Sequence, residues 1–220
     1  MLGLALTALH AASCAGTDAA REERERRERE QAEAQRVAER TPPPPRRPPR
    51  ATVGIWVSPE ELMPRPTSGP AWERLKAAAD GPLGEADIAD QDSNHDVRTL
   101  AVALVYARTG EESYRAKAAD AIESAVGTEE GGRTLALGRN LLSYVIAADL
   151  IDLRAYDPAR EETFSAWLEA VRRKPFGGGP GPGTLISTVE SSMSNWGGMA
   201  GASRVAVAAY LNDEKDLARA

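Results

Sequence analysis

The stretch GRTLALGRNLLSYVIAADLIDL, residues 132–153, decides the fold class. When it is wound as an α-helix it is apolar on nearly every side, and the polar exceptions are Arg139, Asn140, Ser143 and Asp149. A helix that is apolar all round is buried among other elements, whereas a surface helix keeps one polar face. The stretch therefore predicts a helix buried within a helical bundle.

Amphipathic helices are predicted on both sides of this stretch. Apolar residues recur three and four positions apart in residues 93–110, 111–127 and 157–174, which is the spacing of one helix face. A further helix is expected over residues 194–211, and another one starts in residues 212–220. Sparse β-branched residues and abundant Ala favour helix over strand. We predict an all-α fold, arranged as a two-layered array or toroid of helical hairpins.

The first 50 residues cannot contribute to that core. Residues 1–17 form a signal-peptide-like segment, in which a short apolar run leads through small residues into Cys14 as in a bacterial lipobox. Residues 18–50 hold opposite charges and then a proline tract, which predict a solvated helix and a semi-rigid linker. The helical domain is then residues 51–220. We expect an exported chain, periplasmic, secreted or tethered to a membrane through lipidated Cys14; the alternative is an alanine-rich helix start.

The charge balance excludes one class of partner. The chain has a formal net charge of -6, and its acidic part is residues 51–220. Nucleic-acid binding needs clustered Lys and Arg that contact phosphates, so no nucleic-acid partner is expected. Two His and one Cys cannot make a His or Cys cluster, so we predict no metal and no other cofactor.

Three blocks carry a resemblance to a known family. They are residues 94–122 (NHDVRTLAVALVYARTGEESYRAKAADAI), 134–153 (TLALGRNLLSYVIAADLIDL) and 194–220 (SNWGGMAGASRVAVAAYLNDEKDLARA). In this order they resemble the alginate-lyase-like family of polysaccharide lyases, and the resemblance covers residues 53–220. It implies an (α/α) toroid that cleaves a uronic-acid polysaccharide such as alginate by β-elimination. We expect an incomplete toroid, because the last helix start is followed by no stop signal.

The resemblance implies a role for Asn195 in neutralising the substrate carboxylate. Removing the proton beside a uronate carboxylate is feasible when that carboxylate is neutralised or hydrogen-bonded, and a base and an acid must flank the carbon. In the family an Asn supplies part of the neutralisation, while an adjacent His and a later Tyr and Arg handle charge and proton transfer. Asn195 matches the Asn, but Trp196 stands in the place of the His. An indole cannot act as a base, so Trp196 is predicted to stack on a sugar face.

Five further residues are candidates, and each has a structural alternative. Arg139, Asn140 and Tyr144 lie on or near one helical face, where they can bind a carboxylate and donate a phenolic proton. The alternative for them is a buried network that ties two helices together. His95, beside a predicted helix start, is either catalytic or a capping or surface residue. Arg204 either faces the cleft or pairs with an acidic neighbour.

Two functions of different classes follow. The first is an exported polysaccharide lyase-like domain whose partner is an acidic polysaccharide. Its predicted site residues are Asn195, Tyr144 and His95 for catalysis and Trp196, Arg139, Asn140 and Arg204 for substrate binding. The second is a non-catalytic glycan-binding or scaffold module, which the missing His at position 196 favours. An inactive fragment is the third possibility.

Overall fold

The computed structural model describes residues 24–27, 29, 54–177 and 183–220. The chain divides into two units, residues 1–48 and 49–220, and each is described by itself.

The first unit is helical where it is described. Residues 24–27 are helical, and the guanidinium of Arg29 lies 3.7 Å from the carboxylate of Glu25, one helical turn away. This pair has the spacing on which the predicted charged helix depends. The predicted signal-like segment with Cys14 and the proline-rich linker lie outside the described residues.

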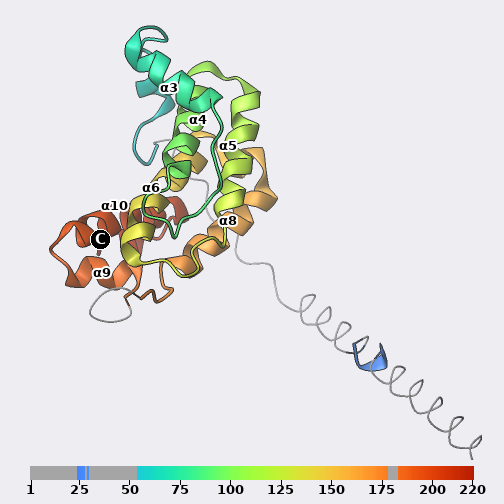
Figure 1. Cartoon of the computed structure of the whole chain (residues 1–220), viewed down its shortest axis with the longest axis vertical. Helices are drawn as coiled ribbons and strands as arrows, with labels where there is room; N and C mark the ends of the chain where they lie inside the picture. Colours follow the sequence, from blue (N-terminus) through green and yellow to red (C-terminus); the bar gives the residue numbers. More distant parts are fainter. Residues whose placement is uncertain (1–23, 28, 30–53, 178–182) are drawn as a thin grey trace, which may run out of the picture. The chain divides into compact units, whose positions relative to one another are not determined.

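Helices joined by loops make up the second unit in the residues that the structure describes (Figure 1). In chain order they are α2 (Pro59–Leu62), α3 (Pro70–Asp80), α4 (His95–Thr109), α5 (Glu112–Ala125), α6 (Thr134–Leu150), α7 (Leu153–Tyr156), α8 (Pro158–Val171), α9 (Leu185–Ser191), α10 (Asn195–Leu211) and α11 (Glu214–Leu217). No strand occurs in this part of the chain, so the predicted all-α class is confirmed. Among the described helices, none is long and apolar enough to cross a membrane.

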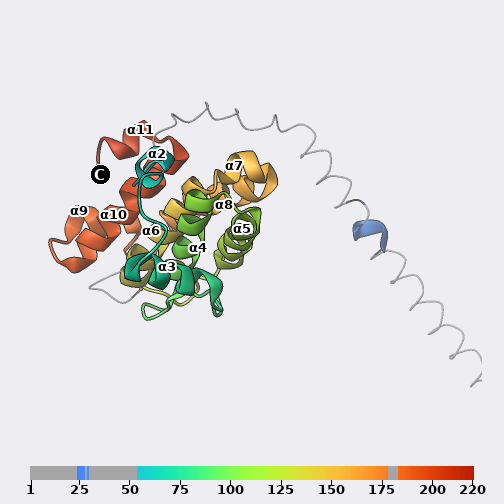
Figure 2. The same ribbon diagram turned by 90° about the horizontal axis from the view of Figure 1, so that it is seen from above.

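Helix α6 lies at the centre of the second unit. It packs between α4 and α10, and Figure 2 shows it between these two helices. Within α6, the residues that are not buried are Leu135, Arg139, Leu142 and Asp149. Helices α5 and α8 contact each other, and each also contacts a member of the α4, α6 and α10 row. The predicted burial of this helix is therefore observed, and it follows from its apolar composition on all sides.

A glycine allows α6 and α10 to approach closely. A Cβ atom added to Gly138 would lie 2.9 Å from the backbone nitrogen of Ala200 and 3.0 Å from its Cα. The Ser203 hydroxyl donates a hydrogen bond of 2.7 Å to the Gly138 carbonyl oxygen. Backbone therefore packs against backbone at this crossing, and no larger residue fits at position 138 without displacing α10.

Local sequence signals fix where the helices begin. The Asp157 side chain accepts from the backbone N–H of Arg160, and Pro158 occupies the first turn of α8. At α10 the Ser194 hydroxyl accepts from the backbone N–H of Trp196. Both caps satisfy N–H groups that have no partner inside the helix. The start of α10 is thus set by Ser194, as the sequence predicts.

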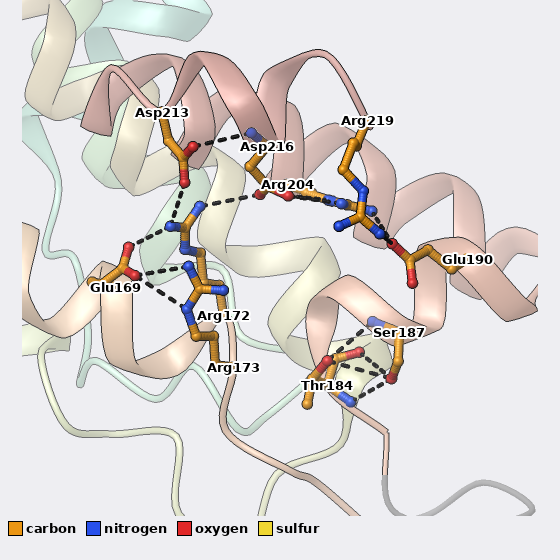
Figure 3. Close-up of polar contacts among 10 residues, drawn as sticks. All are labelled: Glu169, Arg172, Arg173, Thr184, Ser187, Glu190, Arg204, Asp213, Asp216 and Arg219. Atoms are coloured by element: carbon orange, nitrogen blue, oxygen red, sulfur yellow. Dashed lines mark hydrogen bonds and ion pairs between the residues drawn. The ribbon is translucent and has the colours of Figure 1, made fainter.

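A buried ionic cluster ties α11 to the rest of the second unit (Figure 3). One carboxylate oxygen of Asp216 accepts from Arg204 Nη2 at 2.7 Å and from Nε at 3.1 Å. The other oxygen accepts from Arg172 Nη1 at 3.1 Å. Asp213 accepts from Arg172 Nη2 at 2.7 Å. Because Arg172 and Arg204 are almost wholly buried, their charges need compensation, which these carboxylates supply together with Glu169 beside Arg172 and Glu190 beside Arg204.

The Asp216→Asn substitution tests this dependence. It leaves the shape of the side chain but removes the charge shared by two buried guanidinium groups, so we expect the free energy of unfolding to fall by about 3 kcal/mol. Urea denaturation followed by circular dichroism measures the change. The control is Asp120→Asn, which breaks an exposed ion pair with Arg160 and costs about 1 kcal/mol or less. Equal effects of the two substitutions would contradict a buried cluster.

The close approach at Gly138 gives a second stability prediction. Gly138→Ala places a methyl group against the backbone of α10, and we expect a loss of about 1–3 kcal/mol of unfolding free energy. Gly198→Ala is the matched control, because a Cβ at this helical position meets nothing within 4 Å. That variant gains about 0.5–1 kcal/mol from helix propensity alone. A stabilised Gly138→Ala protein in thermal denaturation would show that the helices are not in backbone contact.

Candidate functional site

The start of α4 meets the middle of α6 through a His–Tyr pair. The Nδ1 atom of His95 lies 2.7 Å from the hydroxyl oxygen of Tyr144. Both side chains are buried, with 4% of His95 and 1% of Tyr144 exposed. The Thr99 hydroxyl donates to the His95 carbonyl oxygen at 2.8 Å, one turn along α4. The capping and surface roles considered for His95 are therefore excluded, because its ring is buried and bonds to another helix.

A second hydrogen bond runs beside the first. The Ser143 hydroxyl donates to Asp96 Oδ2 at 2.9 Å, and both residues are buried. Asp96 follows His95 in the chain and Ser143 precedes Tyr144, so neighbouring residues on each helix make neighbouring bonds. Sequence reasoning did not single out Asp96 or Ser143 as site residues. Their positions directly beside two predicted site residues are the signal that points to them.

Asn140 and Arg139 extend this cluster toward the loop that precedes α4. The Asn140 amide nitrogen donates to the carbonyl oxygens of Ile88, at 3.2 Å, and Asp90, at 2.8 Å. Arg139 is exposed, and its guanidinium lies 3.9 Å from a carboxylate oxygen of Asp92. Asn140 therefore anchors the loop, whereas Arg139 remains accessible to an anion from solvent. Arg139, Asn140 and Tyr144 all lie within α6, the helix that the sequence predicts for them.

Burial favours the uncharged form of both residues in the His–Tyr pair. Burial lowers the pKa of His95, and the nearby Arg98 charge lowers it further. Burial also raises the pKa of Tyr144, to which the Asp96 carboxylate adds. A neutral imidazole and a neutral phenol are therefore paired. The tautomer of His95 sets the direction of the bond: with the proton on Nε2 the Tyr144 hydroxyl donates to Nδ1, and with the proton on Nδ1 the imidazole donates to the hydroxyl oxygen.

Asp96 is a buried carboxyl group beside this pair. Burial raises its pKa, and hydrogen bonds from Ser143 and the backbone oppose that rise. Its position at the first turn of α4 places it where the helix dipole favours a negative charge. The Asp96 carboxyl group thus adds a third titratable group, beside His95 and Tyr144, to the α4–α6 contact.

The start of α10, residues 194–198, is the other part of the predicted site. Asn195 is exposed and Trp196 is half-buried. A Cβ on Gly197 would lie 1.8 Å from the Ser192 carbonyl oxygen, so this glycine accommodates the chain's own backbone. Gly198 faces open space. The α10 start therefore offers solvent a side-chain amide and part of an indole.

The structure separates the predicted residues into three places. His95, Tyr144, Asn140 and Arg139 come together where α4 meets α6, while Asn195 and Trp196 lie at the start of α10. Arg204 is in neither group. Its guanidinium is fully buried and pairs with Asp216. Of the two alternatives predicted for Arg204, the structure therefore shows the pairing with an acidic neighbour.

The acidic side chains near the site were compared with the needs of a metal ion. Among them, no three His, Cys, Asp or Glu side chains are arranged to hold a metal ion. The acidic side chains before α4 instead accept from their own backbone: Asp87 Oδ1 from Ala89 N at 2.9 Å and Asp90 Oδ1 from Asp92 N at 2.9 Å.

Comparison with known proteins yields no match to the chain: no family model, no curated protein and no solved structure is significantly similar. The resemblance to polysaccharide lyases therefore rests on the three sequence blocks alone.

The lowered pKa of His95 predicts how stability depends on pH. The unfolded chain takes up a proton at His95 near pH 6.5, but the folded protein resists protonation until lower pH, so the unfolding free energy falls as the pH drops below about 6.5. Denaturation midpoints measured from about pH 7.5 down to about pH 5.5 should therefore decline. His95→Gln should show a shallower decline, and because His10 is present in both proteins the difference isolates His95. Identical slopes would contradict a buried neutral imidazole.

Proposed function

We propose that residues 51–220 form a polysaccharide lyase-like domain that acts by β-elimination on a uronate-containing polysaccharide such as alginate. The all-helical fold supports this proposal, as does the row of α4, α6 and α10 with α5 and α8 packed against it. In the proposed toroid, these helices are the alternating members of successive hairpins. In the same proposal the chain is exported, and Cys14 carries the lipid that tethers it.

The observation that carries the proposal is the exposed amide of Asn195 in the first turn of α10. A primary amide donates two N–H groups, and the first turn of a helix adds partial positive charge. Both favour a carboxylate whose negative charge spreads into the adjacent carbon as the proton leaves. An amide in this place therefore suits the enolate-like intermediate of uronate elimination.

Trp196 and Arg139 have binding roles in this proposal. The half-buried indole of Trp196 offers a flat apolar surface to one face of a sugar ring. Arg139 has one ion-pair contact, at 3.9 Å, and its guanidinium can take a second uronate carboxylate along the chain. The domain is acidic overall, so attraction of a polyanion depends on such local cations.

Proton transfer is assigned to His95 and Tyr144. A neutral imidazole can accept a proton and a phenol can donate one, so the pair contains both groups that elimination requires. In the described structure these groups bond to each other, are buried and lie in a different place from Asn195. The reaction therefore needs a rearrangement that opens the contact between α4 and α6 and brings the pair to the carbon whose carboxylate Asn195 binds.

The same burial favours a second function, a non-catalytic module that binds uronate glycans. In that case the His95–Tyr144 pair only holds α4 to α6, and the exposed residues at the start of α10 bind the sugar. The two functions differ in turnover but share the ligand.

Asn195→Ala tests the proposed activity. The wild-type protein is incubated with alginate, pectate and other polyuronates, and the ultraviolet absorbance of unsaturated chain ends is followed. We expect turnover by the wild type and a loss of about 10²–10³-fold in the variant, as for removal of one donor to a developing negative charge. Thr163→Ala, an exposed polar position on α8, serves as the control and should retain full activity.

Glycan binding separates the two functions. Wild-type binding without turnover supports the non-catalytic module and contradicts the lyase. If the wild-type protein neither binds nor cleaves any polyuronate, both functions are contradicted.

A further inference from the structure

The Asn140 side chain has one hydrogen-bonding atom without a protein partner. Asn140 is 1% exposed, and its carbonyl oxygen Oδ1 is buried and receives no hydrogen bond from any described residue. Buried polar atoms in folded proteins are almost always satisfied by protein groups or by ordered water. This oxygen therefore requires a donor from outside the described residues.

The orientation of the amide is fixed by its other atom. The amide nitrogen donates to two backbone carbonyl oxygens, those of Ile88 and Asp90. Rotating the amide by 180° would bring Oδ1 against these two acceptors and would lose both bonds. Oδ1 is thus the unpaired acceptor, and the missing group must be a hydrogen-bond donor.

A second open acceptor lies on the same face of α6. Tyr144 follows Asn140 by four residues, which places the two side chains next to each other on the helix. Its hydroxyl oxygen lies 2.7 Å from His95 Nδ1, and with two lone pairs it keeps the capacity to accept a further hydrogen bond. Side chains in helices lean toward the N-terminus, so the Tyr144 ring extends over the turn that carries Asn140.

We infer that one internal water molecule binds between Asn140 and Tyr144 and donates one hydrogen bond to Asn140 Oδ1 and the other to the Tyr144 hydroxyl oxygen. Water suits this site because it carries two donors on one small atom, and the two partners meet its minimum need. The water links the loop before α4 to the His95–Tyr144 pair and favours the Tyr144 hydroxyl as donor to His95. The inference stands independently of the proposed lyase activity.

A crystal structure of the wild-type chain at high resolution tests the inference most directly. We expect electron density for a water within about 3.2 Å of both oxygen atoms. Ordered density for the two side chains without such a water, or a protein donor bonded to Oδ1, would overturn the inference.

Nuclear magnetic resonance of the Asn140 side-chain amide gives a second measurement in solution. We expect cross-peaks between these amide protons and a long-lived bound water in the wild type. Tyr144→Phe removes one of the two acceptors and should abolish the cross-peaks. Ser143→Ala is the matched control, because it loses only the bond to Asp96 and should keep them. Cross-peaks that persist unchanged in Tyr144→Phe would overturn the role of Tyr144.

Discussion

The burial of α6 is the constraint on which the second unit depends. A helix enclosed on nearly all sides cannot leave its polar side chains to solvent, so each must find a partner on a neighbouring element. Tyr144 and Ser143 bond to the first turn of α4, Asn140 to the loop before it, and Gly138 accepts a bond from Ser203 on α10. These bonds set the register of α6 against its neighbours, while apolar packing supplies most of the stabilisation.

The second buried polar cluster has a different role. Arg172 comes at the end of α8, Arg204 from α10 and Asp216 from α11, so one carboxylate joins three helices (Figure 3). Because Arg204 is committed to this cluster, its guanidinium is not available at the surface of α10. In the proposed function, the α10 residues assigned to the sugar acid are therefore Asn195 and Trp196 in its first turn.

Much of the fold could be predicted from the sequence, because helix periodicity and caps are local signals. The apolar run of α6 and the start of α10 after Ser194 are examples. The pairing of His95 with Tyr144 could not be predicted, since it joins positions 49 residues apart on two buried helices. Many polar residues can satisfy one another in such a core, and one sequence does not say which of them meet. The exposure of Asn195 and the burial of Arg204, nine positions later on one helix, likewise depend on the packing of α10 against its neighbours.

The pKa of His95 in the folded protein is the most direct test of the buried contact between α4 and α6. A nuclear magnetic resonance titration of the imidazole ring, with its signals identified through His95→Gln, reports both the pKa and the position of the neutral proton. Burial between α4 and α6 predicts a pKa below about 6.5, and a proton on Nε2 would identify the Tyr144 hydroxyl as the donor. A pKa at or above about 6.5 would contradict a buried imidazole in the contact between α4 and α6.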